Sequence, residues 1–246
     1  DHRRLQMPGQ RECAVVLGIT TDISVGSYGK YPLTEVDQEA LMRPLTKWNT
    51  VIKQAAHIPR MVRAAFRAMT TGRAGSAHLG LPYDIQYDPV DPADIWADPK
   101  HQRYPAYPQA PEPGAAEAAV DAILSAKNPL IVCGGGVVIA GAMAELDRLA
   151  RRLDIPVATS ISGQGSLAET HPNCLGVVGS NGGTDQTWEM MEAADLVVFM
   201  GARAGSTTTA RWEAPKPGTQ VVHFDNDPMV IGANYQTEVG VVGDLR

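Results

Sequence analysis

Short, continuously apolar segments alternate with amphipathic helical segments from residue 115 to the end of this 246-residue chain. Strands that are apolar on both faces are typical of parallel sheets covered by helices on both sides. The sequence therefore predicts an α/β fold with a Rossmann-like, doubly wound and mostly parallel sheet in this part of the chain. We expect its strands over 129–138, 155–161, 174–179, 195–203, 219–227 and 239–244, and its helices over 117–126, 142–154 and 185–194.

The beginning of the chain predicts a smaller α/β unit. A strand over 13–22 is followed by a loop rich in Gly and Pro, and a helix could start at Asp37, which Pro44 would stop or kink. Apolar residues at helical spacing predict a longer helix over 57–73, and a strand follows over 76–82. These elements make one crossover unit, which is too little for a doubly wound sheet.

A proline-rich segment separates the two parts. Eight prolines occur from Pro82 to Pro113, counting both, a composition that favours an extended, semi-rigid connector. We therefore predict a partial α/β unit over 1–86, a linker over 87–114 and a Rossmann-like domain over 115–246. Three aromatic residues are expected to pin the linker to a domain surface: Trp96, Tyr104 and Tyr107.

Composition excludes several classes of protein. A net charge of −6 gives no electrostatic basis for binding nucleic acid. No apolar run reaches the roughly 20 residues that span a bilayer, and the charged start is unlike a signal peptide, so we expect a cytoplasmic protein with no membrane contact. Cys13, Cys133 and Cys174 are widely spaced, which predicts small buried residues and neither disulfides nor a zinc site.

The predicted strands end in glycine or polar residues, and open α/β sheets bind ligands beyond the carboxyl ends of their strands. Glycine lets a phosphate or ring approach the backbone, Arg203 could bind a pyrophosphate, and Asp225 could accept from ribose hydroxyls. The alternative is that these glycines only form tight turns, since GGGVVIAG is not the strict dinucleotide-binding pattern. The candidate cofactor-binding residues are Gly134, Gly135, Gly136, Thr159, Ser160, Gly179, Gly201, Ala202, Arg203, Asp225 and Asn226.

No catalytic or metal-binding residue is predicted. The acidic group at 35–39 is interpreted as a solvated helix start, and His78 and His223 as hydrogen-bonded histidines within strands. The polar segment GSTTTARW at 205–212 suits either phosphate contacts or a surface loop.

Several stretches, taken in order, resemble thiamine-diphosphate enzymes of the acetolactate synthase type. GKYPLTEVDQEALMRPLTKW (29–48) is similar to a loop of that family with the pattern G-x-D-A-F-Q-E-x-D, and residues 58–85 are similar to the end of its pyrimidine-binding domain. NPLIVCGGGVV (128–138) and GQGSLAETHP (163–172) resemble its central domain, as do GAR at 201–203 and DNDP at 225–228.

This resemblance implies a piece of a longer protein: the end of the pyrimidine-binding domain followed by the central domain. The family's coenzyme-activating glutamate and its G-D-G metal motif have no counterpart in the chain, so thiamine diphosphate and Mg²⁺ are expected in the full-length parent and the chain alone is expected to be inactive. The parent would be a dimer or tetramer of identical chains that decarboxylates a 2-oxo acid and then transfers the product to an acceptor or releases an aldehyde.

The resemblance also marks positions that differ. Leu33 and Thr34 stand where relatives have Phe and Gln at the active-site entrance, while Gln164, Ser180 and Asn181 replace other family residues. Relatives use the central pocket for FAD, for ADP or for nothing. Two alternatives remain: a free-standing nucleotide-binding module of deoxyhypusine-synthase or sirtuin-like topology, and a scaffold domain with an empty pocket.

Overall fold

The computed structural model describes residues 15–246, so the predicted strand residues 13 and 14 and Cys13 lie outside the described part. The chain divides into two compact units, the first reaching Tyr107 and the second spanning Pro108–Arg246. Each unit has its own sheet and its own hydrophobic core. The two units are therefore described separately.

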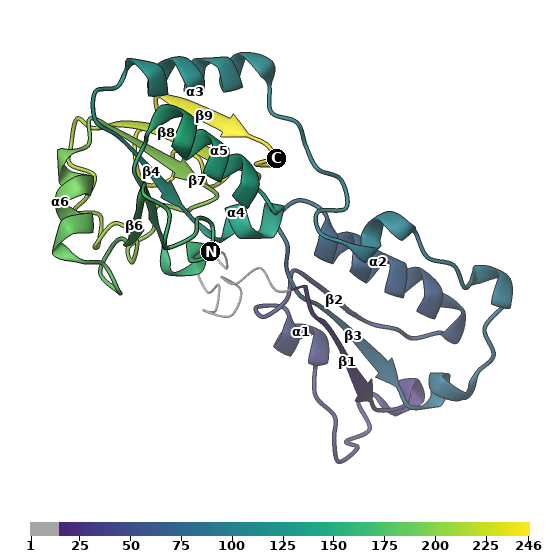
Figure 1. The fold of residues 1–246 in the computed structure, drawn as a ribbon. Helices are drawn as coiled ribbons and strands as arrows, with labels where there is room; N and C mark the ends of the chain where they lie inside the picture. The colour runs from purple at the N-terminus through teal and green to yellow at the C-terminus, as the bar shows by residue number, and fades with distance from the viewer. Residues whose placement is uncertain (1–14) are drawn as a thin grey trace. The chain divides into compact units, whose positions relative to one another are not determined.

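The first unit contains a three-stranded parallel sheet in the order β1-β3-β2 (Figure 1). The central strand pairs with both neighbours in register, Ala77 lying opposite Leu17 on one side and Trp48 on the other. The elements are β1 (Leu17–Asp22), α1 (Gln38–Met42), β2 (Trp48–Val51), α2 (Ile58–Thr70) and β3 (Ala77–Pro82). Short 3-10 turns follow β1, β2 and β3 at Val25–Ser27, Ala55–His57 and Asp84–Tyr87 respectively.

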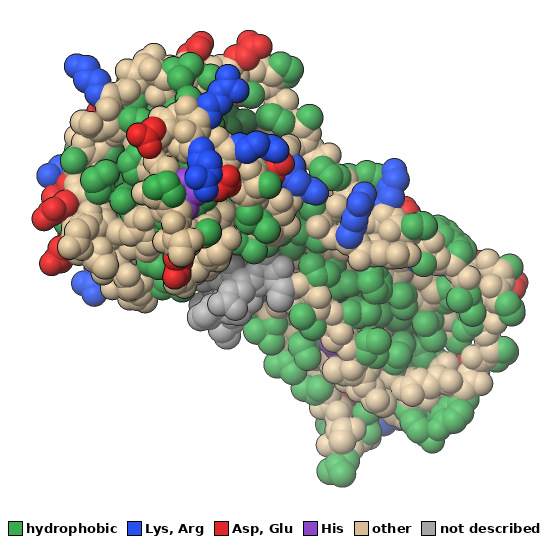
Figure 2. Space-filling view, viewed as in Figure 1, with side chains coloured by type: hydrophobic (Ala, Val, Ile, Leu, Met, Phe, Trp, Pro, Cys, Tyr) green, Lys and Arg blue, Asp and Glu red, His purple; other side chains and the backbone are tan. Residues whose placement is uncertain are grey.

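Helix α2 covers one face of this sheet. Pro59 occupies its first turn, and Gly72, at φ +60°, follows its end, as the sequence predicts. Ala65 and Met69 are buried against Leu79 of β3, and a fully buried side chain of this size stabilises a fold by about 1.5–3 kcal/mol. Hydrophobic side chains also gather on the visible surface of this unit (Figure 2). The edge strand β1 leaves Ile19 exposed.

In this unit one local prediction is confirmed and one strand was missed. Helix α1 ends at Met42, just before Pro44, as expected because proline disrupts a helix. Strand β2 was not predicted, because its four half-buried residues follow the proline without an alternating pattern. Its conformation depends on pairing with β3, where the Lys47 N–H donates to the Ser76 carbonyl.

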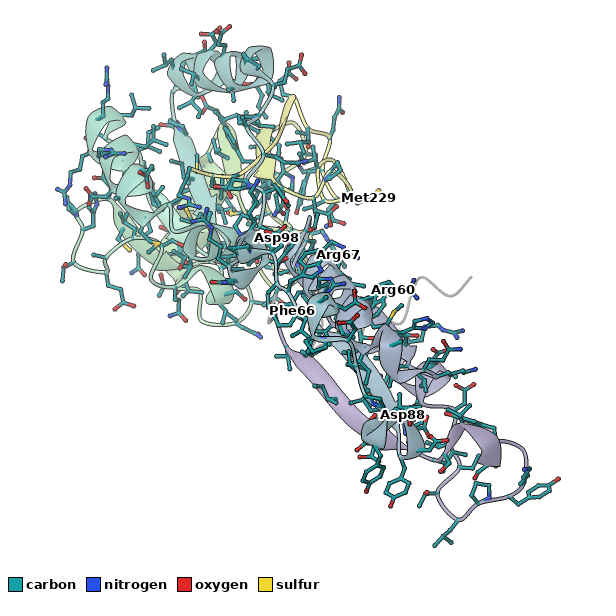
Figure 3. The ribbon with its side chains drawn as sticks, turned by 90° about the vertical axis from the view of Figure 1, so that its right-hand side faces the viewer. Arg60, Phe66, Arg67, Asp88, Asp98 and Met229 are labelled. Carbon is teal, nitrogen blue, oxygen red and sulfur yellow. The ribbon has the colours of Figure 1, made fainter. Side chains whose placement is uncertain are left out.

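The proline-rich segment up to Tyr107 lies along α2 as a strap, defined here as residues 88–107. The Arg63 guanidinium stacks over the Trp96 ring at 4.0 Å and donates to the Asp94 carbonyl, and the Tyr104 hydroxyl donates to the Gly72 carbonyl. Trp96 and Tyr104 therefore hold this segment to the surface, as predicted, whereas the Tyr107 ring packs against His101 and Lys100 of the same segment. Figure 3 labels exposed residues of α2 (Arg60, Phe66 and Arg67) and of the strap (Asp88), together with the half-buried Asp98 of the strap.

The second unit is a six-stranded, wholly parallel sheet in the order β6-β5-β4-β7-β8-β9 (Figure 1). Numbered within the unit this is 3-2-1-4-5-6, the doubly wound Rossmann order, which confirms the predicted fold class. Its strands are β4 (Pro129–Cys133), β5 (Val157–Thr159), β6 (Cys174–Val177), β7 (Leu196–Met200), β8 (Gln220–Asp225) and β9 (Val239–Val242).

Helices cover both faces of this sheet, and successive residues of the central strands enter opposite cores. On β4, Ile131 faces the core formed with α3, α4 and α5, while Leu130 and Val132 face the core formed with α6. This two-sided burial explains the continuously apolar strands. The helices are α3 (Pro113–Ser125), α4 (Gly135–Ala140), α5 (Met143–Leu153) and α6 (Asp185–Ala193).

The strand predicted over 129–138 is too long. Strand β4 ends at Cys133, and residues Gly135–Ala140 form the short helix α4, which ends at Gly141 with φ +69°. Valine and isoleucine in GGGVVIA suggested a strand, but three successive glycines let the chain turn directly into a helix. Strand β5 is likewise only Val157–Thr159 within the predicted 155–161.

No helix among residues 15–246 is long and apolar enough to cross a membrane.

Candidate functional site

The order of strands in the second unit reverses between β4 and β7, which lie side by side in the sheet. In open α/β sheets the crevice at the carboxyl ends of such strands is the usual ligand site. All eleven residues predicted to bind a cofactor lie at or just beyond the carboxyl ends of β4, β5, β6, β7 or β8. Because these strands are parallel, the structure brings those residues to one edge of one sheet.

The glycines after β4 and β7 lie directly against each other. A Cβ atom added to Gly134 would be 2.1 Å from the Gly201 carbonyl oxygen, and one added to Gly136 would be 2.6 Å from the Gly201 Cα. Gly201 itself has φ +56°, a conformation that favours glycine. These three glycines are thus required for contact between two backbone turns, which is the tight-turn alternative considered from the sequence.

Hydrogen bonding in the glycine turn bears on whether it fits a phosphate. The Gly134 N–H donates to the Met200 carbonyl and the Gly136 N–H to the Gly201 carbonyl, at 2.9 and 3.1 Å. The Val137 N–H donates to the Gly134 carbonyl at 3.2 Å. A phosphate cradle needs such N–H groups to point at the ligand. This turn therefore does not fit the role of a diphosphate cradle.

The residues after β5 are tied to β4 in a similar way. The Ser160 N–H donates to the Cys133 carbonyl at 2.8 Å, and a Cβ added to Gly163 would be 2.2 Å from the same carbonyl oxygen. Thr159 is buried. Gly163 was not among the predicted cofactor-binding residues, although it begins the segment GQGSLAETHP that resembles the family's central domain.

Gly179, after β6, contacts a loop that joins β7 to β8. A Cβ on Gly179 would be 2.0 Å from the Thr207 carbonyl oxygen, which also accepts from the Ser180 N–H at 2.8 Å. The loop contains three successive residues with positive φ, Ala210, Arg211 and Trp212. This backbone conformation is strained for residues other than glycine. A cavity of about 290 Å³ lies between these loops, lined in part by Gly179, Asp185, Trp188, Ala210 and Glu213.

The end of β8 completes this edge of the sheet. The His223 Nε2–H donates to the Ala202 carbonyl at 2.8 Å, so His223 is a hydrogen-bonded core histidine, as predicted. Burial lowers the pKa of its imidazole, and the hydrogen bond and Asp225 only partly offset this. The Asp225 carboxylate accepts from the Asp227 N–H at 2.9 Å, and the Arg203 carbonyl accepts from the Asn234 amide.

A larger cavity, of about 440 Å³, lies away from the predicted site. It is lined by Lys127 and Asn128 before β4, by Pro129 at the start of β4, by Asp154 and Ile155 before β5, and by the ends of α3 and α6. These residues belong to the amino edge of the sheet. The cavity therefore shares no residue with the predicted cofactor site.

In the first unit, the predicted entrance residues Leu33 and Thr34 lie in the loop between β1 and α1, and Leu33 is fully exposed. His78 is buried, and its Nε2 lies 2.8 Å from the Thr20 hydroxyl, which confirms its interpretation as a core histidine. Asp37 caps α1, consistent with the predicted helix start.

Sequence reasoning missed a polar network at the base of this loop. The buried Asp22 carboxylate accepts from the Tyr28 hydroxyl at 2.6 Å and from the Ile23 N–H at 2.8 Å. Burial and the hydrogen bond to Asp22 raise the pKa of Tyr28. An aspartate at the end of a predicted strand, just before a glycine-rich loop, was the only signal for it.

Within residues 15–246 no group of three or more His, Cys, Asp or Glu is placed to hold a metal ion, and Cys133 and Cys174 are free. Burial raises the pKa of the Cys133 thiol to about 12, so this cysteine is a structural residue, as predicted; Cys174 is only half-buried.

Comparisons with known proteins agree with these observations. Residues 116–246 match the family described as thiamine pyrophosphate enzyme, central domain. A probable acetolactate synthase large subunit of Methanocaldococcus jannaschii is 34% identical over 233 residues, which are 94% of this chain and 39% of that protein. The acetolactate synthase of Arthrospira platensis is 31% identical, over 94% of this chain and 40% of its own length.

A glyoxylate carboligase of Escherichia coli O157:H7 is 31% identical over 94% of this chain and 38% of its own length. The chain thus spans about two fifths of the length of these relatives, and the matches include both units. They do not support a free-standing nucleotide-binding module. The chain belongs to the thiamine pyrophosphate enzymes of the acetolactate synthase type, and residues 116–246 are their central domain.

Proposed function

We propose that the full-length protein containing this chain is a thiamine-diphosphate-dependent carboligase or decarboxylase of 2-oxo acids. The observation that carries the proposal is a match over 94% of the chain to relatives named acetolactate synthase and glyoxylate carboligase. A match to the central domain alone would say little about the reaction, because one fold can serve many reactions. The match here includes the first unit as well.

The coenzyme, when bound, supplies the electron sink that lets a 2-oxo acid lose CO₂. We assign no catalytic residue to this chain. We also assign it no Mg²⁺ ligand, since the described residues contain no metal-binding cluster. Residues 15–107 would contribute the active-site entrance through Leu33 and Thr34. By itself the chain would be inactive.

For the central domain we propose that FAD or ADP binds at the carboxyl edge of the sheet. Arg203 follows β7, Asp225 is the last residue of the adjacent strand β8, and Asn226 follows it, so a cation and a carboxylate for phosphate and ribose groups lie at neighbouring strand ends. The glycine turn after β4 would pack these loops together without binding phosphate, because two of its N–H groups donate to the carbonyls of Met200 and Gly201 at the end of β7.

A scaffold role without a nucleotide is the second candidate. Direct contact between the turns after β4 and β7 favours this role, since the contact fills part of the crevice in which a nucleotide would otherwise bind. In either case we propose a cytoplasmic homodimer or homotetramer.

Two experiments test these proposals. The full-length gene product should release CO₂ from pyruvate or from glyoxylate only when thiamine diphosphate and Mg²⁺ are added. If it turns over neither acid, the proposed activity is rejected. Titrating residues 15–246 with FAD and with ADP should raise the melting temperature, and Arg203→Ala should abolish the increase while the exposed Arg152→Ala preserves it. No shift with either nucleotide would support the scaffold role.

A further inference from the structure

The outer face of α3 exposes two large apolar side chains. The inner face of this helix is buried, with Ala119 and Ile123 in the core of the second unit. On the other side, Val120 is 51% exposed and Leu124 is 62% exposed. They are four residues apart and therefore neighbours on one helix face. No other described element of the second unit covers this face (Figure 1).

Opposite charges lie at the two ends of this apolar pair. Glu117 precedes Val120 by three residues, on the same face of the helix. Lys127 follows the end of the helix and lines the same cavity of about 440 Å³ as Leu124, so it lies beside that leucine. The Asp195 carboxylate accepts from the Lys127 N–H at 2.8 Å, which fixes the backbone there. We call Glu117, Val120, Leu124 and Lys127 the α3 stripe.

Neither charged end of the stripe is neutralised within the chain. Both side chains are exposed, and neither Glu117 nor Lys127 forms an ion pair with any of residues 15–246. They cannot pair with each other, because ten residues of helix separate them by about 15 Å. The stripe therefore presents an acid, two apolar groups and a base, in that order.

We propose that the α3 stripe docks against the same stripe of a second copy of this chain, with the two helices antiparallel. A two-fold axis near Ala122 would bring Val120 opposite Leu124 of the partner subunit. The same axis would bring Glu117 opposite the partner's Lys127. Parallel helices would instead place each charge opposite its own copy, which is unfavourable.

A second copy is the partner that the order of residues fits best, because the acidic end of the stripe complements its own basic end. Two-fold contacts of this self-complementary kind are the commonest association of identical chains. The small side chains of Ala116 and Ala118 flank Glu117 and allow two helices to approach to about 8 Å. Asp121 would meet its own copy at the rim of the contact, where solvent keeps the repulsion small.

Sedimentation equilibrium of the 246-residue chain tests the docking. The unaltered chain should dimerise reversibly in the micromolar range, as expected for a contact below about 1,200 Å². Leu124→Lys should raise the dissociation constant roughly tenfold or more, because each subunit then brings a charge into the apolar centre. Met229→Lys is the matched control: it charges an apolar side chain of the same unit that is 80% exposed, and it should leave the constant unchanged. A chain that stays monomeric far above micromolar concentrations, or a dimer that Leu124→Lys leaves intact, would overturn the proposal.

A charge exchange tests the antiparallel arrangement without altering the apolar residues. Glu117→Lys and Lys127→Glu should each weaken the dimer roughly fivefold, since each puts like charges together at two symmetric contacts. The double variant Glu117→Lys/Lys127→Glu should restore the original dissociation constant. Rescue of this kind requires a contact between subunits, because the two residues are too far apart within one chain.

High salt should reduce the effect of each single exchange, and melting temperatures show whether every variant is folded. A double variant as weak as the single ones would overturn the antiparallel pairing. This contact specifies one surface of the proposed homo-oligomer and does not depend on the proposed activity. Loss of the dimer would therefore leave that activity to be decided by CO₂ release from the full-length protein.

Discussion

Gly134 and Gly201 touch backbone to backbone, the carbonyl oxygen of Gly201 lying 2.1 Å from the position where a Cβ of residue 134 would be. The two residues end neighbouring strands, β4 and β7, at the point where the strand order reverses. The Gly201 carbonyl is part of the backbone and cannot rotate away as a flexible side chain could. A side chain at position 134 must therefore push the ends of β4 and β7 apart.

Gly134→Ala is therefore expected to lower the free energy of unfolding by about 3 kcal/mol, the upper range for overpacking a tight interior. Urea unfolding followed by circular dichroism measures this. Gly114→Ala is the matched control, since a Cβ there meets no atom within 4 Å and lies in the first turn of α3; it should be neutral or stabilising by about 0.5 kcal/mol. Equal stability of the two variants would contradict the argument.

His223 is expected to make stability depend on pH. Its pKa is lowered in the folded state, mainly by burial, so the unfolded chain binds a proton first as pH falls. The stability from neutral His223 is fully present above the unfolded pKa of about 6.5 and decreases as pH falls below that value. His223→Gln should lose less stability than the unaltered chain between pH 8 and pH 5.5, measured by urea unfolding at both values. Parallel losses would show that His223 does not titrate in this way.

Asp195 is expected to stabilise the junction before β4. Its two carboxylate oxygens accept from the Lys127 and Asn128 N–H groups at 2.8 and 2.9 Å, and these bonds lower its pKa. Asp195→Asn should cost about 1 kcal/mol at pH 7, a value reduced for solvent exposure. Stability from a carboxylate with a lowered pKa is present above about pH 4 and is lost as pH falls through the folded pKa, so the difference should shrink toward pH 3.

Thermal unfolding at pH 7 and pH 3 tests this prediction. Asp121→Asn, at an exposed position on α3, is the control and should change little at either pH. A cost for Asp195→Asn that is the same at both values would contradict the role of its charge.

The doubly wound sheet could be predicted because burial on both faces leaves a signal within each strand, as in Leu130 and Ile131, which face different cores. The turn after β4 could not, because its conformation depends on Gly201, some 65 residues later in the chain. The same limit applies to Asp22, whose partner Tyr28 is defined only by the course of the loop, and to strand β2, which is defined by pairing with β3. Features that depend on the sequence of one segment could thus be predicted, whereas features that depend on contact with a second segment could not.

Tyr235 is expected to hold the strained loop after β7 in place. Its hydroxyl donates to the Ala214 carbonyl at 2.8 Å, and its ring stacks on Phe199 at a centroid distance of 6.0 Å and an interplanar angle of 28°. Ala214 follows Ala210, Arg211 and Trp212, whose positive φ values cost energy that surrounding contacts must offset. Tyr235→Phe keeps the stacking and should cost about 1 kcal/mol in urea unfolding. Tyr235→Leu removes both contacts and should cost about 1 kcal/mol more, and it should increase proteolysis at Arg211 in a brief trypsin digest. Unchanged cleavage at Arg211 in both variants would show that the loop keeps its conformation without Tyr235.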